Sequence, residues 1–168
     1  MQLSGDGFII KTVFENNLDD ILNVYRQCED FLTLGPNPKA SAEMVLNDIE
    51  SADNNMRSYC GIFRDDAMIG VVDFSPANHG GMSGAAYIAL LMIAENFRNQ
   101  GIGEAVLKRL EKDILENSGI QVIRAGVQTN NHKAISFWQR MGYSITGEPM
   151  NLEDGTNCFE LEKRVTLR

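Results

Sequence analysis

The stretch LLMIAENFRNQGIGEAVLKRLE, residues 90–111, places an apolar run, a glycine-containing turn and an amphipathic segment in succession. The apolar run begins at Ala85 and is continuous rather than alternating, which predicts a strand over residues 85–94 that is buried on both faces. After the turn, Leu107, Leu110 and Ile114 recur at helical spacing and predict a long helix that Gly119 would end. The stretch therefore predicts a strand, a turn and a helix at the centre of the fold.

The rest of the chain alternates between predicted strands and helices. Further strands are predicted for residues 8–14, 58–64, 67–74, 120–130, 143–150 and 158–165. Helices are predicted after Asn17 and after Ser41, which are candidate N-caps, and within AISFWQRMGY, residues 134–143. This order predicts an α/β (α+β) fold with a single mixed, mostly antiparallel central sheet of about seven strands and helices on both faces.

Composition narrows the class of protein. The 168 residues suit one domain over residues 1–168, and 43% apolar with 23% charged residues is ordinary for a soluble globular protein. A net charge of −8 disfavours a nucleic-acid-binding surface and mildly favours a cationic substrate such as an amine. The N-terminus does not resemble a signal peptide, and the longest apolar run is about half of the roughly 20 residues that a membrane helix needs.

The cysteines indicate a reducing compartment. Cys28, Cys60 and Cys158 are odd in number, far apart in the sequence and outside any CxxC pattern. A disulfide framework or a zinc site is therefore disfavoured, and no metal is expected. Free thiols in the cytoplasm are the expected state.

The turn RNQGIG, residues 98–103, predicts an anion site. The first turn of a helix has unpaired backbone N–H groups and a positive dipole end, and glycine lets the backbone approach a ligand closely. Arg98 adds a positive charge, and the combination suits a pyrophosphate. A Rossmann fingerprint would need a small residue where Val106 stands, and a Walker loop would need GKS or GKT. A glycine-rich turn without a ligand is the alternative.

Two motifs at a fixed spacing resemble those of the GCN5-related N-acetyltransferase (GNAT) family. The first is R/Q-x-x-G-x-G/A after a strand, and the second is N-x-x-A-x-x-x-Tyr-x-x-x-G-Phe/Tyr. The matching residues are Arg98, Gly101, Gly103, Asn131, Ala134, Gly142 and Tyr143. The match is most specific over about residues 85–143, and it departs from the family where Trp138 stands in place of the tyrosine.

The resemblance implies a GNAT-like domain that binds acetyl-CoA. It implies that strands 85–94 and 120–130 splay apart to admit the thioester, and that the first of them pairs with the pantetheine arm like an added strand. The loop at residues 100–103 would bind the pyrophosphate through its amides. The cofactor-binding residues implied in this way are Leu91, Met92, Ile93, Arg98, Asn99, Gln100, Gly101, Ile102, Gly103, Glu104, Asn131, Lys133 and Trp138.

The resemblance also implies transfer of the acetyl group to a primary amine of a small molecule or peptide, by direct attack on the thioester. This reaction needs a neutral amine, a polarised carbonyl and a stabilised leaving thiolate. The family often uses a tyrosine for the last task. The indole N–H of Trp138 can donate a hydrogen bond but cannot act as an acid near neutral pH. Its place in a helical stripe with Ala134, Phe137 and Met141 predicts a packed side chain, and the resemblance implies that this side chain lies beside the CoA arm.

No residue stands out as the base. Tyr87 lies eleven residues before Arg98, where a histone-modifying branch of the family has a glutamate, and it can orient an amine. Asp73 and Glu95 are candidate carboxylates, and His79 lies in a glycine-rich loop. For each charged candidate, the alternative is a solvated surface group. Tyr87, Asp73 and Trp138 are taken as the candidate catalytic residues.

The sequence says least about the residues that bind the acceptor. Glu29, Asp30 and Phe31 are candidate substrate-binding residues, because this region shapes the acceptor site in the family. The alternatives to an enzyme are a CoA-binding sensor or interaction domain without turnover, and a domain that binds a different nucleotide at residues 98–103. The oligomeric state stays open, although homodimers are common among such proteins.

Overall fold

The computed structural model describes residues 1–116 and 119–165, which form eight strands and five α-helices. The helices are α1 (Leu18–Arg26), α2 (Glu29–Leu32), α3 (Ala42–Asn54), α4 (Ile102–Glu116) and α5 (His132–Arg140). The strands are β1 (Gln2–Gly5), β2 (Phe8–Thr12), β3 (Ser58–Arg64), β4 (Ala67–Ser75), β5 (Ala85–Ile93), β6 (Val122–Gln128), β7 (Ser144–Asn151) and β8 (Asn157–Arg164). Among these residues, no helix is long and apolar enough to cross a membrane.

All eight strands belong to one sheet, in the order β1-β2-β3-β4-β5-β6-β8-β7. Only β5 and β6 are parallel, so the predicted mixed, mostly antiparallel sheet is confirmed. The sheet has eight strands rather than about seven, because β1 pairs with β2 from Gln2↔Lys11 to Gly5↔Phe8. The turn between them is Asp6-Gly7, with Gly7 at φ +74°, and Asp-Gly between short strands is a hairpin signal that the prediction did not use.

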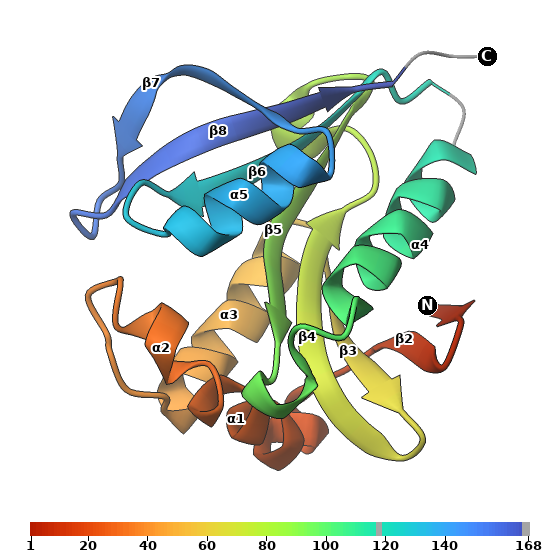
Figure 1. The fold of residues 1–168 in the computed structure, drawn as a ribbon, viewed down its shortest axis with the longest axis vertical. Coiled ribbons are helices and arrows are strands. Elements are labelled where there is room, and N and C mark those ends of the chain that lie inside the picture. The colour runs from red at the N-terminus through yellow and green to blue at the C-terminus, as the bar shows by residue number, and fades with distance from the viewer. Residues whose placement is uncertain (117–118, 166–168) are drawn as a thin grey trace.

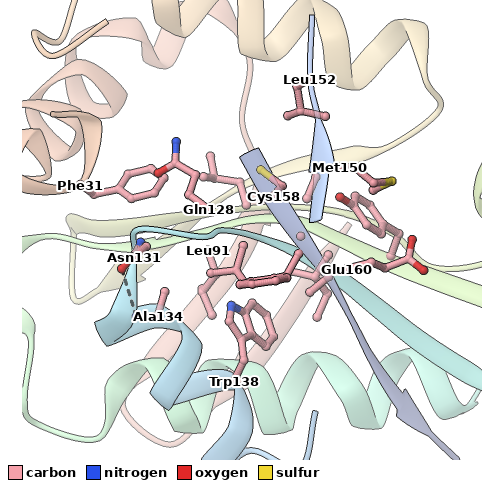
Figure 2. Close-up of a pocket in the computed structure, with 18 residues that line it drawn as sticks. Phe31, Leu91, Gln128, Asn131, Ala134, Trp138, Met150, Leu152, Cys158 and Glu160 are labelled. Carbon is pink, nitrogen blue, oxygen red and sulfur yellow. Dashed lines mark hydrogen bonds between the residues drawn. The ribbon is translucent and has the colours of Figure 1, made fainter. Parts of the chain in front are cut away.

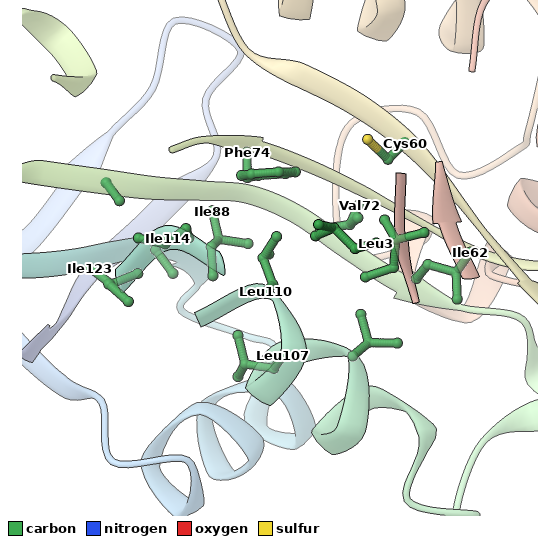
Figure 3. Close-up of a cluster of buried hydrophobic side chains, with 14 of the residues drawn as sticks. Leu3, Cys60, Ile62, Val72, Phe74, Ile88, Leu107, Leu110, Ile114 and Ile123 are labelled. Carbon is green, nitrogen blue, oxygen red and sulfur yellow. The ribbon is translucent and has the colours of Figure 1, made fainter. Parts of the chain in front are cut away.

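Helices cover both faces of the sheet, as Figure 1 shows. The helices α4 and α5 pack on one face, and α1 and α3 pack on the other. In Figure 3, Leu107, Leu110 and Ile114 point from α4 toward the strands, which confirms the predicted apolar stripe. The opposite core is filled from α1 and α3 by Ile21, Val24, Tyr25, Val45 and Ile49.

The two predicted N-caps differ in outcome. The Ser41 hydroxyl accepts a hydrogen bond from the backbone N–H of Met44 at 3.1 Å and caps α3 as expected. Asn17 does precede α1, but its side chain makes no cap bond to that helix. Its Oδ1 instead accepts from the backbone N–H of Phe14 at 3.2 Å. The reason is a short 3-10 turn at Glu15–Asn17, which turns the Asn17 side chain back toward the preceding strand.

The parallel strands β5 and β6 separate before they end. Their pairing runs from Ala85↔Val122 to Ile88↔Ala125, whereas β5 continues to Ile93 and β6 continues to Gln128. A β-bulge begins at the same point, because Phe74 of β4 pairs with Ile88 while Asp73 pairs with Leu90. Ala89 is the extra residue, and a bulge bends its strand. The splay that the resemblance implied is therefore present.

Candidate functional site

A cavity of about 290 Å³ lies where β5 and β6 separate (Figure 2). Five parts of the chain form its wall. Phe31 comes from α2, residues 87–91 from β5, and residues 125–128 from β6. The rest of the lining is Asn131, Ala134 and Trp138 at α5, and Met150, Leu152, Cys158, Phe159 and Glu160 in the β7–β8 hairpin.

The cavity has walls on both faces of the sheet. Trp138 belongs to the core under α4 and α5, whereas Phe31 packs against the core under α1 and α3. Successive side chains of a strand point to opposite faces. Gly126 and Glu160 are paired neighbours in β6 and β8, so they lie on the face opposite their buried neighbours Ala125 and Leu161. In Figure 2, Trp138 and Leu152 lie on opposite sides of the strands.

The loop that precedes α4 has backbone that a ligand can approach. Asn99 and Gly101 both have left-handed backbone, with φ of +58° and +76°. A Cβ built on Gly101 would meet nothing within 4 Å, and one on Gly103 would come no closer than 3.7 Å to Phe137. Since α4 begins at Ile102, the first N–H groups of the helix point out of this open turn.

The side chains of the loop make their own contacts. Glu104 is bonded to Lys108 at 2.6 Å, one turn along α4, and both side chains are more than half exposed. Gln100 donates to the carbonyl of Asn96 at 3.1 Å, and Ile102 is buried in the core. The backbone N–H groups of the loop are therefore the groups most available to a ligand.

Arg98 joins the end of β5 to the first two helices. Its Nε donates to the carbonyl of Ile93 at 2.8 Å, one terminal nitrogen pairs with Asp30 at 2.7 Å, and the other donates to the carbonyl of Gln27 at 3.3 Å. The hydrogen bond from Arg98 lowers the pKa of the Asp30 carboxyl. Arg98 and Asp30, predicted for different substrates, thus form one ion pair.

The backbone carbonyl of Ile93 and the side chain of Asn131 also make hydrogen bonds within the protein. The Cys28 thiol is a second donor to the Ile93 carbonyl, at 3.5 Å, so this carbonyl already has two partners. Asn131 caps α5, since its Oδ1 accepts from the N–H of Ala134 at 3.1 Å (dashed in Figure 2). Asn131 lines the cavity, whereas Ile93 lies at the end of β5 outside the lining. Lys133 follows in the first turn of α5, outside the residues that line the cavity.

Trp138 is a packed residue with one edge on the cavity. Its side chain is only 6% exposed, and its ring makes edge contacts with Tyr143 at 4.8 Å and Phe137 at 5.6 Å between centroids. Tyr143 is buried, as its place in the motif predicted, and its hydroxyl donates to Glu111 at 2.9 Å. The stripe predicted for this helix is present, although Ala134, Phe137 and Met141 are only partly buried.

Of the two candidates for orienting or deprotonating the amine, Tyr87 and Asp73, only Tyr87 lines the cavity. Tyr87 lines the cavity, its ring stacks on His79 with centroids 4.1 Å apart, and burial raises the pKa of its phenol. Asp73 is not among the lining residues, and Arg57 Nε donates to both of its carboxylate oxygens, at 3.0 and 2.9 Å. Burial raises the pKa of Asp73, and Arg57 opposes that rise.

Of the three acceptor-side candidates, only Phe31 reaches the cavity. Glu29 faces the other way, where its carboxylate accepts from Lys39 at 2.8 Å and from the N–H of Ala40 at 3.1 Å. Asp30 is held by Arg98. The acidic pair that motivated this candidate site is therefore bound within the protein.

Several lining residues were not candidates from the sequence: Gly126, Gln128, Met150, Leu152, Cys158 and Glu160. The Gln128 Oε1 atom is buried and has no hydrogen-bond partner among the described residues. The missing information is the strand order, because β8 rather than β7 lies beside β6. With that order known, the alternation of side chains along a strand would have placed Cys158 and Glu160 on the face of Gly126.

Known proteins share both the sequence pattern and the architecture. A family model described as the acetyltransferase (GNAT) family matches residues 18–143. N-alpha-acetyltransferase 30 of Schizosaccharomyces pombe (strain 972 / ATCC 24843) is 34% identical over 79 residues, which is 47% of this chain and 52% of that protein. The chain thus spans about half the length of this curated relative.

Two solved structures share the fold over nearly the whole chain. An acetyltransferase from Thermus thermophilus has a TM-score of 0.81 at 19% identity, covering 98% of this chain and 100% of that one. RimL, a ribosomal L7/L12 alpha-N-protein acetyltransferase in complex with coenzyme A, has a TM-score of 0.76 at 16% identity, covering 98% of both chains. At these identities, the likeness concerns the fold.

Proposed function

Because the chain belongs to the acetyltransferase (GNAT) family, we propose that it is an acetyl-CoA-dependent N-acetyltransferase that transfers the acetyl group to a primary amine. The observation that carries the proposal is the separation of β5 from β6 after Ile88↔Ala125, which opens a cavity with walls on both faces. A cofactor on the α5 side and an amine on the α2 side would meet inside the sheet.

The residues present fit the cofactor. The open turn at Gly101 and Gly103, at the start of a fifteen-residue helix, suits the pyrophosphate. Leu91 and Met92 follow the bulge, beyond the pairing with β6, and their backbone is suited to hold the pantetheine arm as an added strand. Asn131 and Trp138 would flank that arm. Arg98 would act indirectly, by fixing the end of β5.

When bound, acetyl-CoA supplies the activated acetyl group, and the chain supplies orientation and polarisation. The bulge leaves Ala89 without a partner on β4, and residues 89–91 have none on β6. A backbone N–H of this segment is suited to donate to the carbonyl oxygen as its negative charge develops. Tyr87 would orient the amine from the opposite face, and Trp138 would exclude water beside the arm.

The acceptor proposed is the α-amino group of a protein or peptide. The names of two relatives specify N-alpha-acetylation, which supports this class over a free small amine. A cytoplasmic location belongs to the same proposal, since three free cysteines, two of them buried, suit a reducing compartment. A second candidate function is a CoA-binding domain without turnover, which Trp138 favours by replacing the tyrosine that often protonates the thiolate.

Two measurements on the purified protein test these candidates. Saturating acetyl-CoA should raise the melting temperature, because a ligand at 100 times its Kd stabilises the native state by about 2.7 kcal/mol. Adding peptides with free N-termini should then release CoA, detected as free thiol. The absence of a thermal shift at millimolar acetyl-CoA would contradict the enzyme and the binding domain alike. A shift without amine-dependent release would favour the binding domain.

A substitution can separate a hydrogen-bonding role of the Trp138 indole from its role in packing. Trp138→Phe should cost about 1–2 kcal/mol of stability, because a buried ring is shortened, and should keep kcat within about threefold. Urea unfolding and steady-state kinetics measure the two effects. Phe137→Leu, a change at the neighbouring and less buried ring, is the matched control. A large fall in kcat for Trp138→Phe alone would instead assign the indole N–H a hydrogen bond to the leaving sulfur.

A further inference from the structure

Gly126 leaves a gap in the middle of β6. A Cβ built on Gly126 would lie 2.9 Å from the hydroxyl oxygen of Tyr87, closer than side-chain carbons are found. The φ of Gly126 is not positive, so no turn requires a glycine here. Glycine inside a strand weakens it and often marks a close approach of a ligand. The residue thus lets the Tyr87 hydroxyl lie directly against the backbone of β6, and the two together form a notch in the cavity lining.

Glu160 forms the other side of this notch. It is paired directly opposite Gly126 in the β6–β8 ladder and lines the cavity (Figure 2). Among the described residues that line the cavity, it is the one carboxylate. Its nearest cation, Arg124, is 3.8 Å away and lies much closer to Glu162, at 2.6 Å. The Glu160 carboxylate is therefore the less tightly paired of the two and remains one-third exposed.

Tyr87 is held in position over the notch. Its ring lies nearly parallel to that of His79, with an interplanar angle of 12°. A ring fixed on one face by such a stack has little freedom to move its hydroxyl group. The notch therefore has one neutral oxygen, on β5, and one carboxylate, on β8, as hydrogen-bond acceptors.

We propose that this notch, between Tyr87 and Glu160 at Gly126, is the subsite for the primary ammonium group of the acceptor. The inference deepens the proposed function and rests on it. A primary ammonium has three N–H donors and one positive charge, so it matches a carboxylate and a hydroxyl oxygen together. A methyl group on the nitrogen would remove one of these donors and place a carbon between the two acceptors.

The rim of the cavity indicates what the amine is attached to. Met150 and Leu152 of the β7–β8 hairpin are 51% and 45% exposed, and both line the cavity, as does Phe31. Met150 and Leu152 lie in the wall that faces away from Trp138, whereas Phe31 lies at the other end of the cavity from Glu160 (Figure 2). The subsite therefore fits an ammonium next to an apolar side chain, as at a peptide N-terminus that begins with leucine.

Glu160→Gln tests the subsite, with Glu162→Gln as its matched control on the same strand and face. With a Leu-initiated peptide, Glu160→Gln should lower kcat/KM about tenfold to hundredfold, mainly through KM, because a charge-assisted hydrogen bond is lost. Glu162→Gln should stay within about twofold of the wild type. Both should keep the full thermal shift with acetyl-CoA. Equal kcat/KM values for the two variants would overturn the subsite.

Two further experiments test the shape of the notch. Gly126→Ala should lower kcat/KM about as much as Glu160→Gln, and the acetyl-CoA shift reports whether the variant is folded. The wild type should prefer the free amine over the N-methylated form of the same peptide by at least about tenfold, since one donor is missing. Equal use of the two peptides would contradict the proposal.

The subsite is also measurable if the protein proves to bind CoA without turnover. Calorimetric titration of the Leu-initiated peptide into CoA-saturated protein then reports binding alone. Glu160→Gln should weaken this binding about tenfold or more, and Glu162→Gln should not. Peptide affinity that is the same in both variants would overturn the subsite, whereas a lack of amine-dependent CoA release would overturn only the proposed enzyme activity.

Discussion

Gly103→Asp is expected to abolish acetyl-CoA binding in a protein that stays folded. A Cβ at this position would make only ordinary contacts, 3.7 Å from Phe137 and 3.8 Å from Ile93. The new carboxylate would lie in the first turn of α4, where the helix dipole stabilises a negative charge by about 0.3–1 kcal/mol. The same charge would repel the pyrophosphate, and we expect a loss of affinity of about 100-fold or more.

The measurement is the melting temperature with and without acetyl-CoA. Gly103→Ala is the matched control, because it adds the carbon without the charge and should retain much of the thermal shift. Gly101→Ala is a poorer probe, since φ of +76° strains any other residue there and would mix folding with binding. If Gly103→Asp kept the thermal shift of the wild type, the pyrophosphate could not lie at this turn.

Arg57→Ala should lower the free energy of unfolding by about 3–5 kcal/mol, although it removes no apolar core residue. The side chains of Arg57 and Asp73 are only 13% and 5% exposed and form a bidentate ion pair. Removing the cation leaves a buried carboxylate without its charged partner. Urea unfolding measures the loss, and a value below about 1 kcal/mol would show that water or another donor replaces Arg57.

A double-mutant cycle completes this test. Arg57→Ala combined with Asp73→Asn should be less destabilised than the sum of the two single variants, because the second change removes the unpaired charge. The Asp73→Asn variant also tests the catalytic candidate from the sequence. Normal kcat in the folded variant would make Asp73 a structural residue, whereas a large loss of kcat would make it part of the reaction.

The parts of the fold that local sequence determines were predicted well. The strand, turn and helix over residues 85–116 follow from an apolar run, two glycines and a helical stripe, each a property of neighbouring residues. The missed strand, β1, has only four residues, too few to show a period, and its evidence was the Asp6-Gly7 turn. Asn17 does not cap α1 because its side chain instead accepts from the N–H of Phe14, which is the N-cap of the preceding 3-10 turn.

In the candidate site, too, local features could be predicted from the sequence, whereas contacts between distant residues could not. The turn at residues 98–103 could be predicted because its glycines and its motif are local features of the sequence. The neighbours of the cavity depend on which strands are adjacent, and no local pattern tells that β8 lies between β6 and β7. The pairing of Arg98 with Asp30 spans 68 residues, so their opposite charges gave no sign that each would be engaged by the other.

Arg98 also connects two parts of the chain that are distant in sequence, the end of β5 and the helix α2. One guanidinium holds the last carbonyl of β5, just before the glycine-containing turn, and the helix that carries Phe31. The bonds of Arg98 thus connect this turn to the helix that supplies Phe31 to the cavity lining. If a ligand at the turn stabilises the bonds of Arg98, it strengthens the binding of a ligand in the cavity. By thermodynamic linkage, the ligand in the cavity then strengthens binding at the turn by the same free energy.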